Sequence, residues 1–322
     1  MSTTVTSAGT GTVDLAGAAI EYLRLRRALG YKLVRQGELL VDFIGYVQVA
    51  GAGHVTIEDA VAWATLPTGA DPVWWSARLG VVRGFARYLH ALDPATEVPP
   101  VGLLPDRDHR VTPYIYTDDD LDRLLNAAGQ LRPAVRAATY QTLIGLLAVT
   151  GMRVGEAIGL DRGGLDSEQG LLTIWHGKFG KSRQLPLHAS TVEALLGYLT
   201  LVRGRCSRTP QGSSMLVSTT GTRLIGNNAS AVFSRLVDDA RLDWAGRRRP
   251  RLHDLRHRFA VATVLGWYRA GLDVEPRLPL LSTWLGHVGP ASTYWYLSAV
   301  PELLALAAQR VDNAKHTAGG RP

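Results

Sequence analysis

The feature that most constrains the fold is a proline-rich segment about one third of the way along the chain. Five prolines lie among charged residues between positions 93 and 113, a composition that interrupts both helices and strands. Because 322 residues are many for one hydrophobic core, we expect two domains joined by a linker at 99–112. The remaining expected boundaries are a disordered lead-in at 1–13, a first domain at 14–98, a second domain at 113–314 and a tail at 315–322.

Charge is distributed unevenly between the two parts. Residues 1–110 carry 10 basic and 11 acidic side chains, a net charge of −1, whereas residues 111–322 carry 25 and 17, a net charge of +8. A basic second part indicates a polyanionic partner, most simply nucleic acid, although many soluble proteins are mildly basic.

Other features exclude several classes of protein. The single cysteine, Cys206, rules out a disulfide framework and a cysteine-based zinc cluster. The longest apolar run, near residues 143–149, is far shorter than the ~20 residues of a membrane span. Residues 1–17 are small and polar and do not form a secretory signal. We therefore expect a cytoplasmic protein with no membrane partner.

The first domain is expected to be all helical. Residues 14–48 carry apolar side chains at helical spacing, with breaks near Gly30 and Gly37, and a second helix is expected at 71–91. Basic residues share other faces of these helices, where they either follow nucleic-acid phosphates or form an ordinary solvated surface. These residues are Arg24, Arg27, Lys32, Arg35, Arg83 and Arg87.

The second domain is expected to be mainly α, with one small antiparallel β-sheet. Thr117 precedes three aspartates, which favours a helix start there. A long apolar helix follows at 133–149, and strands at 171–175 and 184–187 form a hairpin around the turn 178–181. Further helices are expected at 190–200, 227–241, 254–270, 276–286 and 301–312.

Two arginine motifs offer charged donors to a phosphate. Arg153 follows a helix–turn sequence, and Glu156, one helical turn later, can hold its guanidinium by a salt bridge. His253 and Arg256 lie three positions apart on one helical face and can reach one phosphate together. For each motif a purely structural role is the alternative, and His253 with His257 as zinc ligands is a weaker one, because no third ligand is near.

A lysine turn and a tyrosine complete the set. Only four lysines are present, and two of them, Lys178 and Lys181, lie in the expected hairpin turn, where a lysine can hand a proton to a leaving oxygen as arginine cannot. His287 follows Leu-Gly, and Tyr296 lies nine residues later. A tyrosine hydroxyl needs nearby positive charge or a base to act as a nucleophile, and the arginines and His253 would supply both.

In this order and spacing the motifs resemble the tyrosine recombinase family: phage integrases, Xer-type resolvases and integrases of mobile elements. The resemblance covers nearly the whole chain. It implies a helical core-binding domain followed by an α+β catalytic domain, and it selects Tyr296 over Tyr294 and Lys178 over Lys181. The segment before His287 departs from compact Xer-type members by an insertion near 271–279, which blurs the subfamily. The catalytic residues that it implies are Arg153, Lys178, His253, Arg256, His287 and Tyr296, with Glu156 in support.

The resemblance also implies a mechanism and partners. Tyr296 attacks a DNA phosphate to form a 3′-phosphotyrosyl link without metal, ATP or other cofactor. The expected location is the cytoplasm of a prokaryote, in association with the nucleoid. The implied partners are double-stranded DNA and three further copies in a tetramer on two DNA sites, and the need for other recombinases stays open. Two other functions stay open: DNA relaxation like that of a type IB topoisomerase, and a DNA-binding accessory factor that does not cut. Further basic residues expected to contact DNA are Lys181, Arg183, Arg247, Arg248, Arg249 and Arg251.

Overall fold

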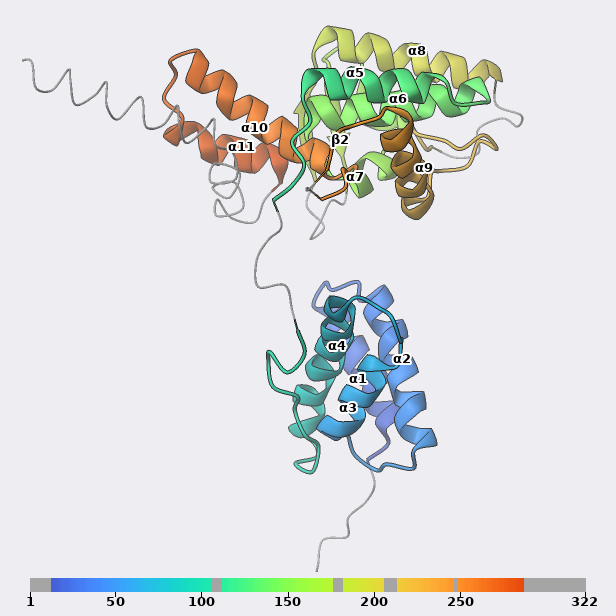
Figure 1. Ribbon diagram of the computed structural model, residues 1–322, viewed down its shortest axis with the longest axis vertical. Coiled ribbons are helices and arrows are strands. Elements are labelled where there is room, and N and C mark those ends of the chain that lie inside the picture. The colour runs from blue at the N-terminus through green and yellow to red at the C-terminus, as the bar shows by residue number, and fades with distance from the viewer. Residues whose placement is uncertain (1–12, 106–111, 176–181, 206–212, 246–247, 287–322) are drawn as a thin grey trace, which may run out of the picture. The chain divides into compact units, whose positions relative to one another are not determined.

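The computed structural model describes residues 13–105, 112–175, 182–205, 213–245 and 248–286. The chain divides into two compact units, Met1–Arg110 and Val111–Pro322, each with its own hydrophobic core (Figure 1). Residues 1–12 of the expected lead-in at 1–13, the expected helix at 301–312 and the expected tail lie outside the described residues.

The N-terminal unit is all helical over the residues described. Its helices are α1 (Leu15–Ala28), α2 (Val34–Val49), α3 (Ile57–Thr65) and α4 (Pro72–His90). Asp14, Thr56 and Asp71 cap three of them, because each side chain accepts a hydrogen bond from a backbone N–H of the first turn. The sequence pattern did not predict α3, because nine residues make too few helical turns to show a clear period.

Two glycines expected to interrupt the first helical stretch behave differently. Gly30 lies in the connection between α1 and α2 with φ +90° and nothing within 4 Å of a Cβ placed there. Gly37 instead lies inside α2 and is buried, so the prediction of a break there was wrong. A Cβ at Gly37 would lie 3.0 Å from Nη2 of Arg27 and 3.6 Å from Leu23, so the glycine lets α1 and α2 pack closely.

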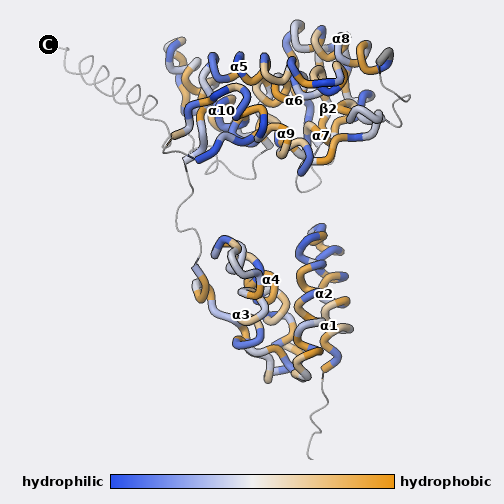
Figure 2. The backbone as a smooth tube through the Cα atoms, turned by 45° about the vertical axis from the view of Figure 1, so that its right-hand side comes forward, coloured by the Kyte–Doolittle hydropathy of each residue, from blue (hydrophilic) through white to orange (hydrophobic). Residues whose placement is uncertain are grey.

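The core of this unit is built around large rings. Phe43 and Trp63 pack edge to face with ring centroids 5.2 Å apart, and Phe85 is fully buried in the same cluster. Arg78 lies over the Trp63 ring at 3.8 Å and donates through Nη2 to the Trp63 carbonyl at 2.9 Å. Figure 2 shows the resulting alternation of hydrophobic and hydrophilic residues around the turns of α1 and α2.

The C-terminal unit is mainly helical with one small sheet, as expected. Its helix α5 begins after Thr117 with a capping box to Asp120, which confirms the helix start predicted there. The helices are α5 (Asp118–Gly129), α6 (Ala134–Thr150), α7 (Val154–Gly159), α8 (Ala189–Arg205), α9 (Gly226–Asp239), α10 (Asp254–Arg269) and α11 (Leu278–Leu285), with 3-10 turns at Arg162–Gly164 and Glu275–Arg277.

The sheet has three antiparallel strands in the order β1 (Leu165–Asp166), β2 (Leu171–Ile174) and β3 (Arg183–Pro186). The pairing of β2 with β3 confirms the predicted hairpin, whereas the two-residue β1 was not predicted. Leu172 pairs with Leu185, and both side chains are fully buried. The turn 176–181 that joins β2 to β3 lies outside the described residues.

Helix α6 is the centre of the C-terminal unit. It packs against α5, α8 and α10 (Figure 1) and is buried on most sides, as its nearly continuous apolar sequence requires. A second apolar cluster joins α10 to α11 through residues such as Val264, Leu281 and Leu285. Among the helices described, none is long and apolar enough to cross a lipid bilayer.

Candidate active site

Two tight turns bring distant segments together in the C-terminal unit. Helix α6 ends at Gly151 with φ +62°, and α11 ends at Gly286 with φ +66°, both in the left-handed region that favours glycine. A Cβ at Gly151 would lie 2.4 Å from the Phe259 ring and 3.0 Å from Leu285. The first turn therefore needs glycine for both conformation and space.

Arg153 follows the first turn and caps the short helix α7. Its backbone N–H donates to Oε2 of Glu156 at 2.9 Å, and its Nη1 donates to Oε1 of the same carboxylate at 2.8 Å. The salt bridge expected between these two residues is therefore present. With the Arg153 side chain 22% exposed and that of Glu156 5% exposed, the pair is far less screened than a surface pair.

Arg183, the first residue of β3, contacts the same carboxylate from the other side. Its Nη1 donates to Oε1 of Glu156 at 3.1 Å and its Nη2 donates to Oε2 at 2.8 Å. Each carboxylate oxygen thus accepts two hydrogen bonds, which uses all four of its lone-pair positions. Burial alone would raise the pKa of Glu156, but the hydrogen bonds from Arg183 and Arg153 outweigh burial and lower the pKa to about 2.

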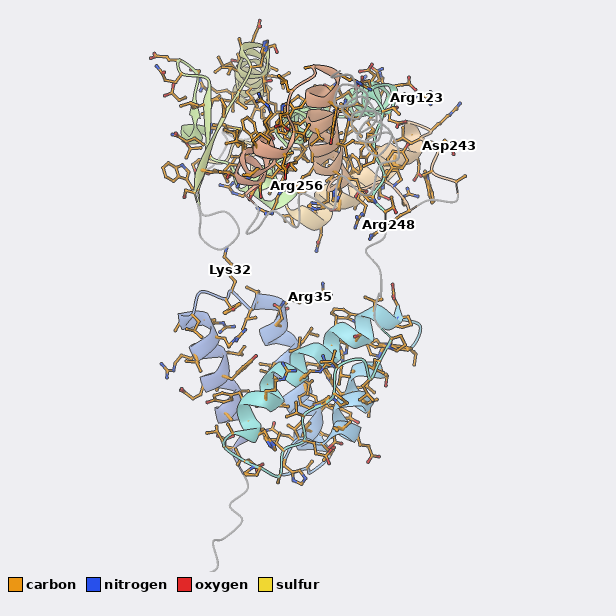
Figure 3. All side chains as sticks on the ribbon, turned by 90° about the vertical axis from the view of Figure 1, so that its left-hand side faces the viewer. Lys32, Arg35, Arg123, Asp243, Arg248 and Arg256 are labelled. Atoms are coloured by element: carbon orange, nitrogen blue, oxygen red, sulfur yellow. The ribbon has the colours of Figure 1, made fainter. Side chains whose placement is uncertain are left out.

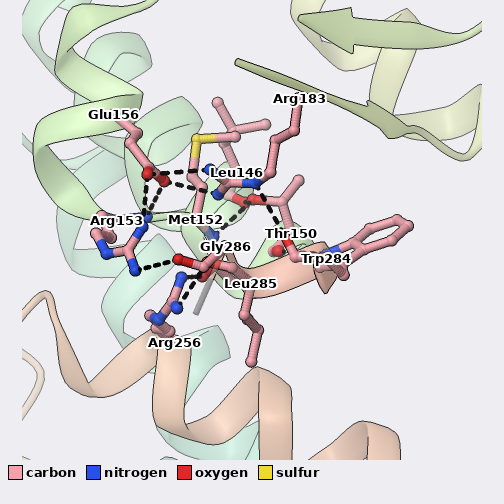
Figure 4. Close-up of polar contacts among 11 residues, drawn as sticks. Leu146, Thr150, Met152, Arg153, Glu156, Arg183, Arg256, Trp284, Leu285 and Gly286 are labelled. Carbon is pink, nitrogen blue, oxygen red and sulfur yellow. Dashed lines mark hydrogen bonds and ion pairs between the residues drawn. The ribbon is translucent and has the colours of Figure 1, made fainter. Parts of the chain in front are cut away.

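Three arginines from different elements meet the three successive carbonyls of the turn 284–286, as Figure 4 shows. The last carbonyls of a helix have no partner within the helix, and positive charge is favourable at this end. The bonds run from Nε of Arg183 to Trp284 O (2.9 Å), from Nη2 of Arg256 to Leu285 O (2.8 Å) and from Nη2 of Arg153 to Gly286 O (2.7 Å).

Arg256 and Trp284 tie this turn to the end of α6. Arg256 is 2% exposed, and its Nη1 donates to the Gly151 carbonyl at 2.8 Å. The Trp284 indole N–H donates to the Thr150 carbonyl at 2.8 Å, and its ring stacks on Phe259. The ends of α6 and α11 are therefore held in one rigid arrangement.

His253 lies directly before α10, one helical turn from Arg256. Its backbone segment is fixed by Asp254, which is fully buried and accepts hydrogen bonds from the backbone N–H and Nη2 of Arg251 at 2.9 and 3.0 Å. Desolvation by neighbouring protein atoms, and then the charge of Arg256, lowers the pKa of His253, although the residue as a whole is exposed. A lowered pKa favours the neutral imidazole, which is the form that can accept a proton.

The expected catalytic residues fall into two groups. Arg153, Glu156, His253 and Arg256 come from α7 and the start of α10, and the charges of both arginines act on His253. Three others, Lys178, His287 and Tyr296, lie outside the described residues.

Tyr116 is a described tyrosine close to the start of α10. It is buried, its hydroxyl donates to the Arg251 carbonyl, and its pKa is raised, so it does not suit the role of a nucleophile.

Several arginines expected to contact DNA have protein acceptors. Arg249 donates to Ser234 and Asp238 on α9, Arg83 donates to the carbonyls of Pro99 and Pro100, and Arg183 holds Glu156. Contact with DNA stays a prediction for these three residues. Arg251 likewise pairs with Asp254.

The remaining expected DNA contacts are more accessible or lie elsewhere. Arg27, Lys32 and Arg87 are exposed, whereas exposed Arg24 pairs with Glu21. Figure 3 shows Lys32 and Arg35 at the same end of the N-terminal unit, and Arg35 lies over the Trp74 ring at 4.4 Å. Arg248 is half-buried. Lys181 and Arg247 lie outside the described residues.

The role of Arg183 was not predicted from the sequence, although the residue pattern of β3 contained a signal for it. Along β3, Arg183 and Leu185 lie on the more buried face and their neighbours are exposed. Because alternate residues of a strand share a face, the buried Leu185 predicts an inward Arg183. An inward arginine requires a buried partner.

The arrangement is suited to an anion with several oxygens. Arg153, Arg183 and Arg256 converge on the turn 284–286, and Glu156 is the carboxylate partner of Arg153 and Arg183. Each arginine carries five N–H donors. Fixed donors of this kind stabilise charge that develops on phosphate oxygens during reaction. Within the residues described, no group of three or more His, Cys, Asp or Glu side chains is placed to hold a metal ion.

Known proteins are similar to this chain in sequence and in fold. The model of the phage integrase family matches residues 115–302. The integrase/recombinase y4rB of Sinorhizobium fredii is 43% identical over 301 residues, which cover 92% of this chain and 96% of the relative.

Among solved structures, the integrase of transposon Tn1549 in complex with transposon right end DNA matches with a TM-score of 0.64 and 15% identity. The match covers 94% of this chain and 99% of that one. A lambda integrase tetramer bound to a Holliday junction matches with a TM-score of 0.58 and 17% identity, covering 89% and 78%.

Proposed function

The chain belongs to the phage integrase family of tyrosine recombinases, and from this we propose that it cuts and rejoins DNA at specific sites through a 3′-phosphotyrosyl intermediate. The observation that carries the proposal is the meeting of Arg153 and Arg256 on the turn that leads to His287. Two rigid guanidinium groups at one place match the oxygens of one phosphate.

The proposed cleavage exchanges one phosphodiester bond for another. The Tyr296 oxygen attacks the scissile phosphorus, and the bond from phosphorus to the 5′ oxygen breaks. The tyrosine proton passes to His253, whose lowered pKa favours the neutral form that can accept it. Lys178 donates a proton to the departing 5′ oxygen, and His287 hydrogen-bonds the phosphate. A 5′-hydroxyl from a second strand reverses the step, so that no energy source is consumed.

The charge of the reacting phosphate is the main obstacle to this step. Attack by tyrosine spreads additional negative charge over the equatorial oxygens, and Arg153 and Arg256 are preorganised to stabilise it. Their positions are fixed by carbonyls and by Glu156 rather than by the substrate. Little reorganisation of the two arginines is therefore needed when DNA binds.

The partner we propose is double-stranded DNA, held by the N-terminal helical unit (14–98) and the catalytic unit (113–314) joined at 99–112. The exposed basic residues Arg27, Lys32 and Arg87 and the net charge of +8 on residues 111–322 support binding to phosphates. A tetramer on two DNA sites is proposed because lambda integrase assembles so on a Holliday junction. The similarity to y4rB and to the Tn1549 integrase favours integration or excision of a mobile element.

Neither alternative function is favoured. DNA relaxation without recombination and DNA binding without cleavage both lack support among the family matches, whose descriptions are those of integrases and recombinases.

A covalent trapping experiment tests the proposal. A nicked duplex that loses its short 5′-hydroxyl fragment after cleavage accumulates the protein–DNA adduct on a denaturing gel. We expect an adduct with the native protein and none with Tyr296→Phe, which should bind the duplex with unchanged affinity. An adduct that persists in Tyr296→Phe and vanishes in Tyr294→Phe would assign the nucleophile to Tyr294.

A further inference from the structure

We propose that Arg183 is a positioning residue for DNA cleavage: it fixes the guanidinium of Arg153 by holding Glu156 and the turn 284–286 at the same time. This inference rests on the proposed function, because it assigns a role in the same cleavage step. It gives a chemical task to a residue that lies outside the expected catalytic set.

The first argument is the sharing of one carboxylate. Oε1 of Glu156 accepts from Nη1 of both Arg153 and Arg183, at 2.8 and 3.1 Å. Without Arg183, two of the four hydrogen bonds to the buried carboxylate are lost, and the two that remain both come from Arg153 itself. Glu156 would then have no donor outside this pair to hold its carboxylate in place, so it would fix the plane of the Arg153 guanidinium less firmly.

The second argument is the connection to the turn. Arg183 donates through Nε to the Trp284 carbonyl, and Arg153 donates through Nη2 to the Gly286 carbonyl. The contact is close: a Cβ at Gly286 would lie 2.9 Å from Nη1 of Arg183 and 3.4 Å from Nη1 of Arg153. Arg183 therefore acts on Arg153 by two routes, through Glu156 and through the turn.

The third argument is the place of Arg183 in the chain. It begins β3 and pairs with Ile174 of β2, so it stands on the sheet next to the hairpin turn. Its side chain is 16% exposed, and three of its nitrogen atoms donate to protein acceptors. Such an arginine is suited to fixing other groups rather than to following DNA phosphates.

The test compares a charged with a neutral scissile group. Rates of covalent attachment are measured at saturating DNA, with the normal phosphate and with a methylphosphonate at the same position. A methylphosphonate carries no negative charge, so it depends much less on a correctly placed Arg153. We expect Arg183→Ala to slow attachment to the phosphate roughly 10²-fold, as loss of one fixed transition-state donor does. On the methylphosphonate the loss should be within about threefold, and the dissociation constant for DNA should change by less than about threefold.

Three variants make the result specific. Arg153→Ala should show the same pattern with a larger loss on the phosphate. Arg183→Lys keeps the charge but lacks the fork that spans both oxygens, so it should recover only part of the rate. Arg223→Ala is the matched control, because it also removes hydrogen bonds and a salt bridge of an arginine in this unit, and it should leave both rates unchanged.

Several outcomes would overturn the inference. Equal losses on phosphate and methylphosphonate would mean that Arg183 only supports the fold, and weaker DNA binding with an unchanged rate would make it a DNA contact. A rate within about threefold of the native protein would remove any role. Failure of the native protein to form an adduct on either substrate would instead refute the proposed function itself.

Discussion

The exposed arginines of the N-terminal unit differ from the arginines at the end of α11 in what they bind. In the N-terminal unit, Arg27 and Arg87 are exposed, and Arg24 pairs with Glu21 on an exposed surface. In the C-terminal unit, Arg153 and Arg256 donate to main-chain carbonyls at the end of α11. Exposed charges attract a polyanion over distance but hold no geometry, because their side chains are mobile and screened. Charges bound to carbonyls hold geometry, which a reaction requires.

The same contrast explains why one residue type serves both tasks. A helix end supplies fixed carbonyl dipoles, and the forked guanidinium matches two acceptors at once. A lysine at Arg256 could not reach both the Gly151 and Leu285 carbonyls with defined angles. The comparison therefore predicts that substitutions of the arginines bound to the turn 284–286 change rates, whereas those at the surface of the N-terminal unit change affinity.

The largest expected effect is that of Arg256→Ala. This change removes a donor to the phosphate and also unties the Gly151 and Leu285 carbonyls. We expect the rate of covalent attachment at saturating DNA to fall by about 10³-fold or more, with the dissociation constant changed only a few fold. Single-turnover adduct formation with native and variant protein measures this, and a loss below about tenfold would break the contrast between the units.

A smaller effect is expected from alanine at two left-handed glycines. Gly151→Ala adds a Cβ that would lie 2.4 Å from Phe259, whereas Gly30→Ala adds one in open space, and both have positive φ. The strain of the left-handed conformation costs roughly 1 kcal/mol in both variants, and overpacking adds about 1–3 kcal/mol at Gly151 alone.

Urea denaturation of each variant measures the free energy of unfolding. Gly151→Ala should also lower the cleavage rate, because Arg256 binds the carbonyl of this residue, and Gly30→Ala should not. Equal destabilisation by the two substitutions would mean that the site accommodates the methyl group by moving Phe259.

The smallest expected effect concerns Lys32 and Arg24. Lys32 is exposed, whereas Arg24 is already paired with Glu21 at 2.8 Å. Lys32→Ala should weaken DNA binding a few fold and lower the slope of log affinity against log salt by about 0.9, the value for one phosphate contact. Arg24→Ala should change the slope less. Equal slopes for the native protein and both variants would show that this surface makes no phosphate contact.

The sequence predicted the long elements well and the short ones poorly. Apolar spacing located α4 and α6 within about two residues, because long amphipathic or buried helices have a clear period. It missed α3 and β1, and it placed a helix break at Gly37, where tertiary packing of α1 on α2 makes the glycine useful inside a helix. Propensity alone carries no information about such contacts.

For the candidate site, the sequence indicated which residues could act but not what they contact. The pair Arg153 and Glu156 was visible because both lie on one helical turn. Arg183 and Trp284 are 101 residues apart and meet through a main-chain carbonyl, a group that every residue has. No sequence pattern marks such an acceptor, so arginines that bind protein and arginines that bind DNA look alike in the sequence.

The turn 284–286 therefore has consequences for how this site can change during evolution. Each of its three bonds has an arginine on one side and a peptide carbonyl on the other. Replacing the side chain at an acceptor position keeps its carbonyl, whereas replacing any of the arginines removes the donor. Substitutions within the turn are limited by packing and by the left-handed Gly286, not by the hydrogen bonds. Mutational tolerance at this contact is thus one-sided, with the arginines bearing nearly all of the constraint.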